Sequence, residues 1–196
     1  KGKAYFKDVM LKCSKLMQSI VNNPKPVIAE VAGVATAAGC QLVASCDLAY
    51  AGESAKFATP GVNIGLFCST PMVALSRNIS NKHSIEMLLT GDLISSSKAA
   101  EIGLINKMID DSDLKNFVLE RALKISKKSA MTLKIGKEAF YKQIDMTLSE
   151  FLRPAFNSFK SCPAENVGPS AEITITLIFL SVAASSKTNC MFDIIS

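Results

Sequence analysis

Hydrophobic residues in the first part of the chain recur at spacings of three and four. Phe6, Cys13 and Ile20 belong to this stripe, which is typical of a helix that buries one face. Asn22-Asn23-Pro24 ends the pattern, because proline cannot continue a helix. The pattern therefore predicts an amphipathic helix over residues 4–21.

The next part of the chain alternates short apolar runs with small residues. Residues 26–32 form a β-branched run that begins at a proline, which predicts a buried strand. After a predicted turn at 33–36, the small residues of 37–46 predict a helix packed closely on a sheet. Residues 47–51 and 56–58 predict two further strands.

Several later helices have recognisable ends. Ser69 or Thr70 is predicted to cap one helix, and Asn81 a second helix that ends at Gly91. Ser95 is predicted to cap a third, over 96–102, with Gly103 just beyond its end; a strand over 104–109 and helices over 114–125 and 131–141 follow. Short strands alternating with helices predict an α/β domain whose helices cover and flank a twisted sheet.

Composition sets the class of protein. The 196 residues are 48% hydrophobic and 20% charged, which predicts one domain with a buried core. The single histidine, His83, excludes any metal site that needs two histidines from one chain. The six cysteines contain no C-x-x-C pair, so we expect reduced thiols and neither a disulfide scaffold nor a metal site.

Charge and hydropathy argue against two kinds of partner. The net charge is +5, but the lysines are scattered, so we expect no nucleic-acid interface. No signal peptide is visible at the first residues, although the chain does not begin with Met and we expect its natural N-terminus to be missing. The longest apolar run, 173–184, is shorter than the ~20 residues that a membrane span needs.

Four ordered motifs resemble one known family. The segments 25–33 and 38–47, which include Ala38-Gly39-Cys40-Gln41-Leu42, resemble the enoyl-CoA hydratase/isomerase (crotonase) family. Residues 57–65 lie where that family has F-x-x-P-E-x-x-x-G, and residues 89–92 and 99–105 resemble its L-T-G and A-x-x-x-G-L-V elements. The resemblance covers residues 1–148. It implies a crotonase-like (ClpP/crotonase) fold with repeated ββα units, partial here because the family's N-terminal part is absent.

The resemblance implies a site for acyl-CoA thioesters. The family stabilises negative charge on the thioester carbonyl oxygen with two backbone N–H groups, one of them at a helix N-terminus. By position Ala38 supplies that donor here, and its partner belongs to the absent N-terminal segment. The alternative is that Ala38 is a small residue chosen for close packing of helix on sheet.

The resemblance also implies that this chain lacks the residues that serve as acid and base in family hydratases. Family hydratases have two glutamates where this chain has Gln41 and Gly61, and an amide or a hydrogen cannot exchange a proton near neutral pH. The acid that some family isomerases place further along is replaced by Ser69. We therefore name no catalytic residue, and we expect Ala38, Gln41 and Ser69 to contact the substrate. For Gln41 the alternative is a polar residue that completes a helix turn, and for Ser69 it is helix capping.

Other polar residues have simpler explanations. Asn63 and Cys68 are candidates for lining the pocket, although Asn63 equally suits a turn. His83 is predicted to be a solvated residue in the first turn of a helix, and Asp47 to make a structural hydrogen bond. Lys127-Lys128 is predicted to be a solvated helix end, with a basic rim for an adenine-nucleotide phosphate as the alternative.

The functional expectation is an acyl-CoA-binding protein of fatty acid metabolism with weak or no enoyl-CoA hydratase activity. Two alternatives stay open: a CoA-ester decarboxylase that uses only the oxyanion hole, and a non-catalytic regulatory or interaction subunit. No cofactor is expected beyond the coenzyme A thioester itself. The resemblance also implies a mitochondrial protein, and a trimer or dimer of trimers for the family's full-length members.

The last part of the chain, residues 149–196, departs from the family. Arg153-Pro154, Pro163 and Gly168-Pro169 interrupt helices, and the apolar run at 173–184 has no polar face. We expect this divergent tail to lie outside the packed domain. Its uncharged, β-prone stretch at 173–180 is then an aggregation hazard.

Overall fold

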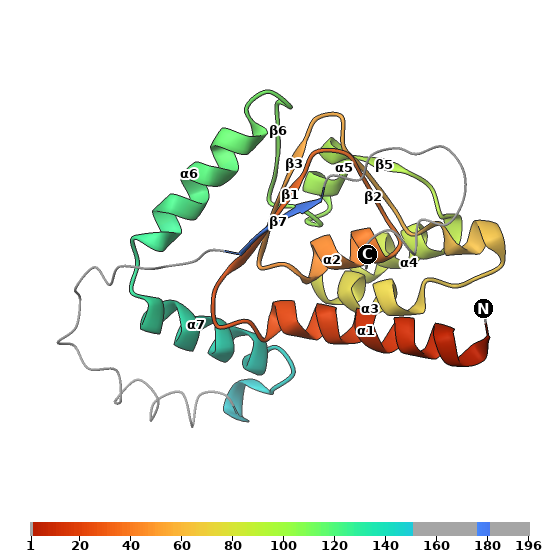
Figure 1. Cartoon of the computed structure of the whole chain (residues 1–196), viewed down its shortest axis with the longest axis horizontal. Coiled ribbons are helices and arrows are strands. Elements are labelled where there is room, and N and C mark those ends of the chain that lie inside the picture. Colours follow the sequence, from red (N-terminus) through yellow and green to blue (C-terminus); the bar gives the residue numbers. More distant parts are fainter. Residues whose placement is uncertain (1, 151–175, 181–196) are drawn as a thin grey trace.

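The computed structural model describes residues 2–150 and 176–180, and Figure 1 shows their arrangement. The helices are α1 (Lys3–Val21), α2 (Ala38–Ser45), the 3₁₀ helix η1 (Pro60–Ile64), α3 (Ser69–Asn78), α4 (Asn81–Thr90), α5 (Ser96–Glu101), α6 (Leu114–Ser126) and α7 (Ala130–Gln143). The strands are β1 (Val27–Val31), β2 (Val34–Thr36), β3 (Leu48–Gly52), β4 (Lys56–Ala58), β5 (Ile94–Ser95), β6 (Lys107–Ile109) and β7 (Thr176–Leu180). This mixture of helices and sheets confirms the predicted α/β class.

Two small sheets organise the core. The first has the order β6-β3-β1-β7 with all neighbours parallel, and the second has the order β2-β4-β5. Every residue of β1 is buried, as expected for a parallel strand that is covered on both faces. Its Val27 packs into the core with α1 and α2, whereas Ile28 packs with Val118 of α6. Figure 1 shows α6 on one side of this sheet and α1 to α4 on the other.

The helix ends test the predicted caps. Ser95 does cap α5, by accepting a hydrogen bond from the N–H of Lys98, and α4 does end at Gly91, whose φ of 67° suits glycine. The predicted caps of α3 and α4 are wrong. Ser80, one residue before Asn81, accepts the bond from the N–H of His83.

In α3 the N-cap residue is Cys68, and no side chain caps the helix. Ser69 is instead its first residue, and the N–H of Ser69 donates to the Phe67 carbonyl at 2.8 Å. The polar residues at 69 and 70 are therefore the first two residues of the helix and do not cap it.

Two strands differ from the prediction, one because of its pairing partner and the other because of a turn. Residues 34–36, predicted as a turn, form β2, which pairs in parallel with β4 and places buried Ala35 beside buried Phe57. The predicted strand over 104–109 is shortened to β6. Its first residues instead make turn bonds, since the N–H groups of Leu104 and Ile105 both donate to the Ala99 carbonyl.

The C-terminal stretch corrects one expectation. β7 pairs in parallel with β1, from Val27 opposite Thr176 to Val31 opposite Leu180, so these five residues do join the sheet. The physical reason is that β3 pairs with only one edge of β1, and an apolar β-prone run provides a partner for the other edge. The remainder of the predicted tail lies outside the described residues, and the domain boundary at residue 148 stays a prediction. No described helix is long and apolar enough to cross a bilayer.

Candidate functional site

The start of α2 follows directly from β2 and is held in a strained conformation. Ala37, which precedes the helix, has φ 48° and ψ −113°, and it is the only described non-glycine residue with positive φ. Side chains disfavour that region, so the surrounding structure must hold it in place. The N–H of Ala37 donates to the Ala58 carbonyl at 3.0 Å, which fixes this point against the end of β4.

Two backbone N–H groups at this helix end have no hydrogen-bond partner among the residues that the structure describes. The first residues of a helix have no intrahelical acceptor, and Ala38 and Gly39 donate no hydrogen bond to any other described residue outside the helix. The helix dipole adds partial positive charge at the same point. Such an arrangement can stabilise an oxygen that becomes negative during a reaction. Ala38 is half-buried, so its predicted role as an oxyanion donor agrees with this geometry and stays a prediction.

Gln41 lies one turn further along α2 and is buried. Its exposed fraction is 7%, and its backbone N–H closes the first turn of the helix on the Ala37 carbonyl. Its side-chain Oε1 has no hydrogen-bond partner, the only such buried side-chain atom in the described part of the chain. The amide is therefore buried without an acceptor role inside the protein.

Gly61, at the second position where the resemblance predicts a replaced glutamate, has no room for a side chain. A Cβ atom built there would lie 2.6 Å from the Leu66 carbonyl oxygen and 2.8 Å from the Cys68 Sγ. One of these neighbours is backbone, and the N–H of Leu66 donates back to the Gly61 carbonyl at 2.9 Å. The turn after η1 thus closes the space that a residue at 61 would fill.

These features lie in one region of the molecule. α2 packs against α3, and burial together with the Cys68 thiol raises the pKa of the Cys40 thiol to about 12. Cys68 in turn lies against Gly61, so the start of α2, η1 and the start of α3 are neighbours. Ser69 follows Cys68 but is exposed on the first turn of α3.

The remaining candidates lie at other positions. Asn63 is exposed, and its side-chain amide lies beside Gly91 at the end of α4. His83 lies in the first turn of α4, with its Nδ1 3.8 Å from Glu86 Oε2, as expected for a residue of that turn. Three or more His, Cys, Asp or Glu side chains do not gather into a candidate metal site anywhere in the described ranges.

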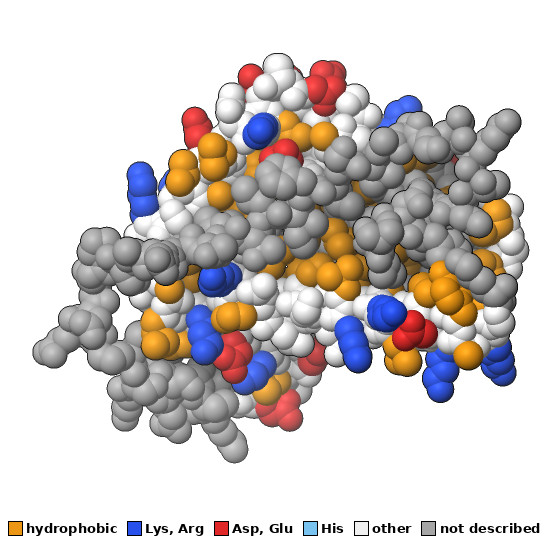
Figure 2. Space-filling model, in the orientation of Figure 1, with side chains coloured by type: hydrophobic (Ala, Val, Ile, Leu, Met, Phe, Trp, Pro, Cys, Tyr) orange, Lys and Arg blue, Asp and Glu red, His pale blue; other side chains and the backbone are white. Residues whose placement is uncertain are grey.

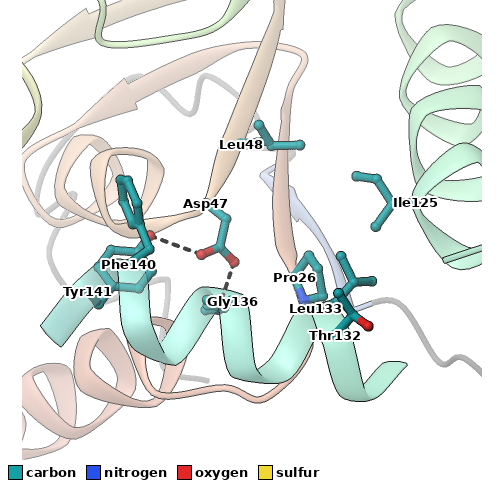
Figure 3. A pocket seen from close by; sticks show the side chains of 10 residues that line it. Pro26, Asp47, Leu48, Ile125, Thr132, Leu133, Gly136, Phe140 and Tyr141 are labelled. Carbon is teal, nitrogen blue, oxygen red and sulfur yellow. Dashed lines mark hydrogen bonds and ion pairs between the residues drawn. The ribbon is translucent and has the colours of Figure 1, made fainter. Parts of the chain in front are cut away.

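Asp47 is the centre of a second polar cluster, at the other end of α2. It accepts hydrogen bonds from the N–H of Val27 at 2.6 Å and from Lys137 Nζ at 2.7 Å. It also accepts one from the Tyr141 hydroxyl at 2.9 Å (Figure 3). Lys137 Nζ also donates to the carbonyls of Ile20 and Lys25. Burial and the adjacent carboxylate raise the pKa of Tyr141. The predicted structural role of Asp47 is confirmed.

A pocket of about 370 Å³ opens beside this cluster, between α7 and the start of β3 (Figure 3). Its lining is mainly apolar and includes Pro26, Leu48, Leu133 and Phe140. The polar atoms of Asp47 and Lys137 at its edge are already bonded to each other and to the protein. Sequence reasoning missed this arrangement; its signal was Lys137 and Tyr141 on one helix face, four residues apart.

Comparison with known proteins identifies the family. The model of the "Enoyl-CoA hydratase/isomerase" family matches residues 2–169. The chain is 49% identical over 148 residues to "Enoyl-CoA hydratase domain-containing protein 3, mitochondrial" of Rattus norvegicus, a match that covers 76% of this chain and 49% of the relative. The Homo sapiens protein of the same name is 49% identical over 147 residues, which cover 75% of this chain and 48% of the relative. The chain thus spans about half the length of these relatives.

Solved structures agree. The human enoyl coenzyme A hydratase domain-containing protein 3 superposes with a TM-score of 0.79 at 46% identity, over 81% of this chain and 63% of that one. The enoyl-CoA hydratase of Mycobacterium smegmatis gives 0.79 at 41% identity, over 82% and 62%. The predicted crotonase-like fold is therefore confirmed, and the chain belongs to the enoyl-CoA hydratase/isomerase family.

Proposed function

We propose that this chain binds acyl-CoA thioesters at the start of α2 and has weak or no enoyl-CoA hydratase activity. The observation that supports the proposal is that free backbone N–H groups adjoin Gln41 and Gly61 where family hydratases carry glutamates. Binding a thioester carbonyl needs donors, whereas adding water to a double bond needs an acid and a base as well.

The N–H group of Ala38 provides one donor in this proposal, and the resemblance assigns the second donor to the family's N-terminal segment. The Ala38 N–H would hold the thioester oxygen, and the dipole of α2 favours the charge that the oxygen gains when an enolate forms. A general base typically contributes about 10²–10⁴-fold to rate, and Gln41 cannot act as one because an amide does not exchange a proton near neutral pH. A hydratase reaction here would therefore be slower by at least this factor.

The space at Gly61 gives the proposal a second support. Leu66 and Cys68 leave no room for a side chain there, so the turn is built for a residue without one. The sequence therefore has no second acid or base at this position, and the local backbone leaves no space for one.

Two measurements on the 196-residue chain test the proposal. Calorimetry with butyryl-CoA is expected to show micromolar binding, and incubation with crotonyl-CoA is expected to show little or no hydration. Ala38→Pro removes the N–H of the first residue of α2, and it is expected to weaken binding about tenfold or more. Asn81→Pro, at the same position of α4, is the matched control. Turnover like that of an ordinary hydratase, or no binding at all, would overturn the proposal.

Decarboxylation of a malonyl-type CoA ester is the second candidate. Loss of CO₂ forms the enolate directly, so the reaction needs orientation and an oxyanion site but no base. The absence of carboxylates at 41 and 61 beside free donors favours this chemistry over hydration. Methylmalonyl-CoA incubated with the chain should then give propionyl-CoA by mass spectrometry, and an unchanged substrate would exclude this candidate.

Compartment and assembly are further parts of the proposal. The relatives are named as mitochondrial, which supports a role in mitochondrial acyl-CoA metabolism. Exposed apolar side chains support a homo-oligomer such as a trimer, since monomers rarely expose large apolar patches. They include Ile64 at the end of η1 and Leu66 and Phe67 between η1 and α3. Figure 2 shows hydrophobic side chains at the surface of one face. Light scattering on the purified chain measures its mass in solution.

A further inference from the structure

The pocket between α7 and the start of β3 lies at the opposite end of α2 from the proposed thioester site. Its volume of about 370 Å³ falls within the range of about 300–1,000 Å³ that is usual for small-molecule sites. Three elements supply apolar side chains to its lining: β3 with Leu48, α6 with Ile125, and α7 with Leu133 and Phe140. The proposed thioester site does not include this pocket.

Most polar side chains in the lining have no free group for a ligand. Lys137 uses its ammonium for three hydrogen bonds, to two backbone carbonyls and to the carboxylate of Asp47. The Tyr141 hydroxyl donates to the same carboxylate. Thr132 is the exception, because its hydroxyl makes no hydrogen bond with the described part of the chain. A ligand would therefore meet hydrocarbon along most of the pocket and one free hydroxyl.

Gly136 leaves space in the wall of the pocket (Figure 3). It lies inside α7, where glycine is less favourable than alanine because it loses more conformational freedom on folding. Its φ is not positive, and no atom lies within 4 Å of a Cβ atom built there. Neither the backbone conformation nor a close neighbour therefore requires a glycine. A larger side chain at this position would fill space that is open to a ligand.

Two lysines lie at one end of the pocket. Lys127 and Lys128 belong to the short connection from α6 to α7, between the lining residues Ile125 and Thr132, and the N–H of Lys128 donates to the Ile125 carbonyl at 2.9 Å. Both lysines are exposed, and neither forms an ion pair with a described residue. Thr132 and Phe140 lie toward opposite ends of the lining part of α7 (Figure 3). The pocket thus has a basic end and an apolar end.

We propose that this pocket binds a single-chain fatty carboxylate. The carboxylate would lie at Lys127, Lys128 and Thr132, and the hydrocarbon chain would extend along α7 toward Phe140. The negative charge complements the basic end, and the chain covers apolar lining without needing a polar partner. The volume is near the lower end of the usual range, so a chain of medium length fits better than a long one. This second site is separate from the proposed thioester site, and neither proposal rests on the other.

Calorimetry on the 196-residue chain with octanoate, butyrate and 1-octanol tests the class of ligand. Octanoate is expected to bind saturably. Butyrate has four fewer methylene groups, and this loss of apolar area should weaken binding by about a hundredfold. 1-Octanol lacks the charge, so it should bind a few-fold more weakly than octanoate, with a smaller difference at high salt. Excess butyryl-CoA should leave the affinity for octanoate unchanged.

A variant that fills the pocket tests its location. Gly136→Leu places a side chain in the open space and should weaken octanoate binding at least about tenfold. Ser76→Leu is the matched control, because it adds the same side chain at an exposed position of α3, which does not line the pocket. It should leave the affinity unchanged.

Removal of the two lysines tests the position of the carboxylate. The double variant Lys127→Gln/Lys128→Gln should lower the affinity for octanoate to that for 1-octanol. Lys56→Gln/Lys82→Gln removes two exposed lysines from β4 and α4, and it should preserve the difference between the two ligands.

Each contrary outcome overturns a definite part of the proposal. An absence of octanoate binding, or binding that is unchanged in Gly136→Leu, overturns the site. Equal affinities for octanoate and 1-octanol in the native chain overturn the class of ligand. Displacement of octanoate by butyryl-CoA would assign octanoate to the thioester site and overturn the second site. If circular dichroism shows that Gly136→Leu does not fold, the double lysine variant and the competition with butyryl-CoA decide the location.

Discussion

The polar groups at the two ends of α2 differ in how completely they are hydrogen-bonded. At its C-terminal end, Asp47 and Lys137 are almost enclosed, and each makes three hydrogen bonds within the protein. At its N-terminal end, the N–H groups of Ala38 and Gly39 and the side-chain oxygen of Gln41 have no partner among the described residues outside the helix, and Ala37 is strained. One helix of eight residues therefore joins a saturated cluster to an unsatisfied one.

This difference indicates that one end of α2 contributes to stability and the other end to ligand binding. A fully bonded, buried ion pair fixes α7 against the ends of β1 and β3, and it has no free group to offer a ligand. Open donors, an unpaired acceptor and backbone strain all cost stability, and they persist where a ligand compensates for them. We therefore expect different effects from substitutions at the two ends. Those at the C-terminal end should lower the free energy of unfolding, and those that remove polar groups at the N-terminal end should weaken ligand binding.

The largest effect is expected from Asp47→Ala. It leaves the ammonium of Lys137 buried without its carboxylate, and it removes the acceptors of Tyr141 and of the Val27 N–H. Breaking a buried pair in this way typically costs about 3–5 kcal/mol of the free energy of unfolding. Urea denaturation measures it. The control is Asp8→Ala, which breaks the exposed pair with Lys12 and should change little; equal effects of the two variants would contradict the assigned role.

Gly61→Glu is expected to have the next largest effect, and it should not create a hydratase. Its Cβ would collide with the Leu66 carbonyl and the Cys68 thiol, so the turn must shift at a cost of about 1–3 kcal/mol. Gly136→Ala in α7 is the matched control. No atom lies within 4 Å of its new Cβ, and alanine should stabilise this helix by about 0.5–1 kcal/mol. A stable Gly61→Glu variant that hydrates crotonyl-CoA would show that the turn accommodates the carboxylate.

The sequence predicted the parts of this fold that depend on local chemistry. The cap at Ser95 and the end of α4 at Gly91 follow from side chains and backbone freedom within a few residues. β2 could not be found in this way, because it becomes a strand only through pairing with β4. The stretch at 173–180 was recognised as β-prone, but its place in the sheet depends on β1, which is distant in sequence. The burial of Glu30 within an otherwise apolar β1 has no account in the local pattern either.

The residues of the candidate site were predicted from the resemblance to the family, but several features of the site were not. The resemblance placed Ala38, Gln41 and Gly61, which the structure brings into one region. The strain at Ala37 and the unpaired oxygen of Gln41 arise from packing, so they have no sequence signal. The same holds for the bonds from Asp47 to Lys137 and Tyr141, which join residues 90 and 94 positions apart.

Ala37→Gly is expected to give a smaller change of opposite sign. Glycine adopts positive φ without a steric penalty, so relief of strain should exceed its entropic cost and raise the free energy of unfolding by about 1 kcal/mol. Ala100→Gly, inside α5, should instead lower it by about 0.5–1 kcal/mol. If both glycines destabilise the protein alike, Ala37 is not strained in solution and the contrast between the two ends of α2 is weaker.

The smallest effect is expected at Glu30 in β1, and it depends on pH. Burial raises the pKa of this carboxyl above its ordinary value of 4.5, with Lys115 opposing the shift. The folded state therefore binds the proton more tightly than the unfolded state, and stability falls as pH rises from 4.5 through the raised pKa. Glu30→Gln should accordingly be more stable than the native chain at pH 7, with the difference shrinking toward pH 4 as Glu30 becomes protonated. Thermal unfolding across this range measures the difference, and Glu53→Gln, at an exposed turn, controls for the loss of one charge. A gain at pH 7 that persists undiminished at pH 4 would mean that the charge of Glu30 does not destabilise the folded state.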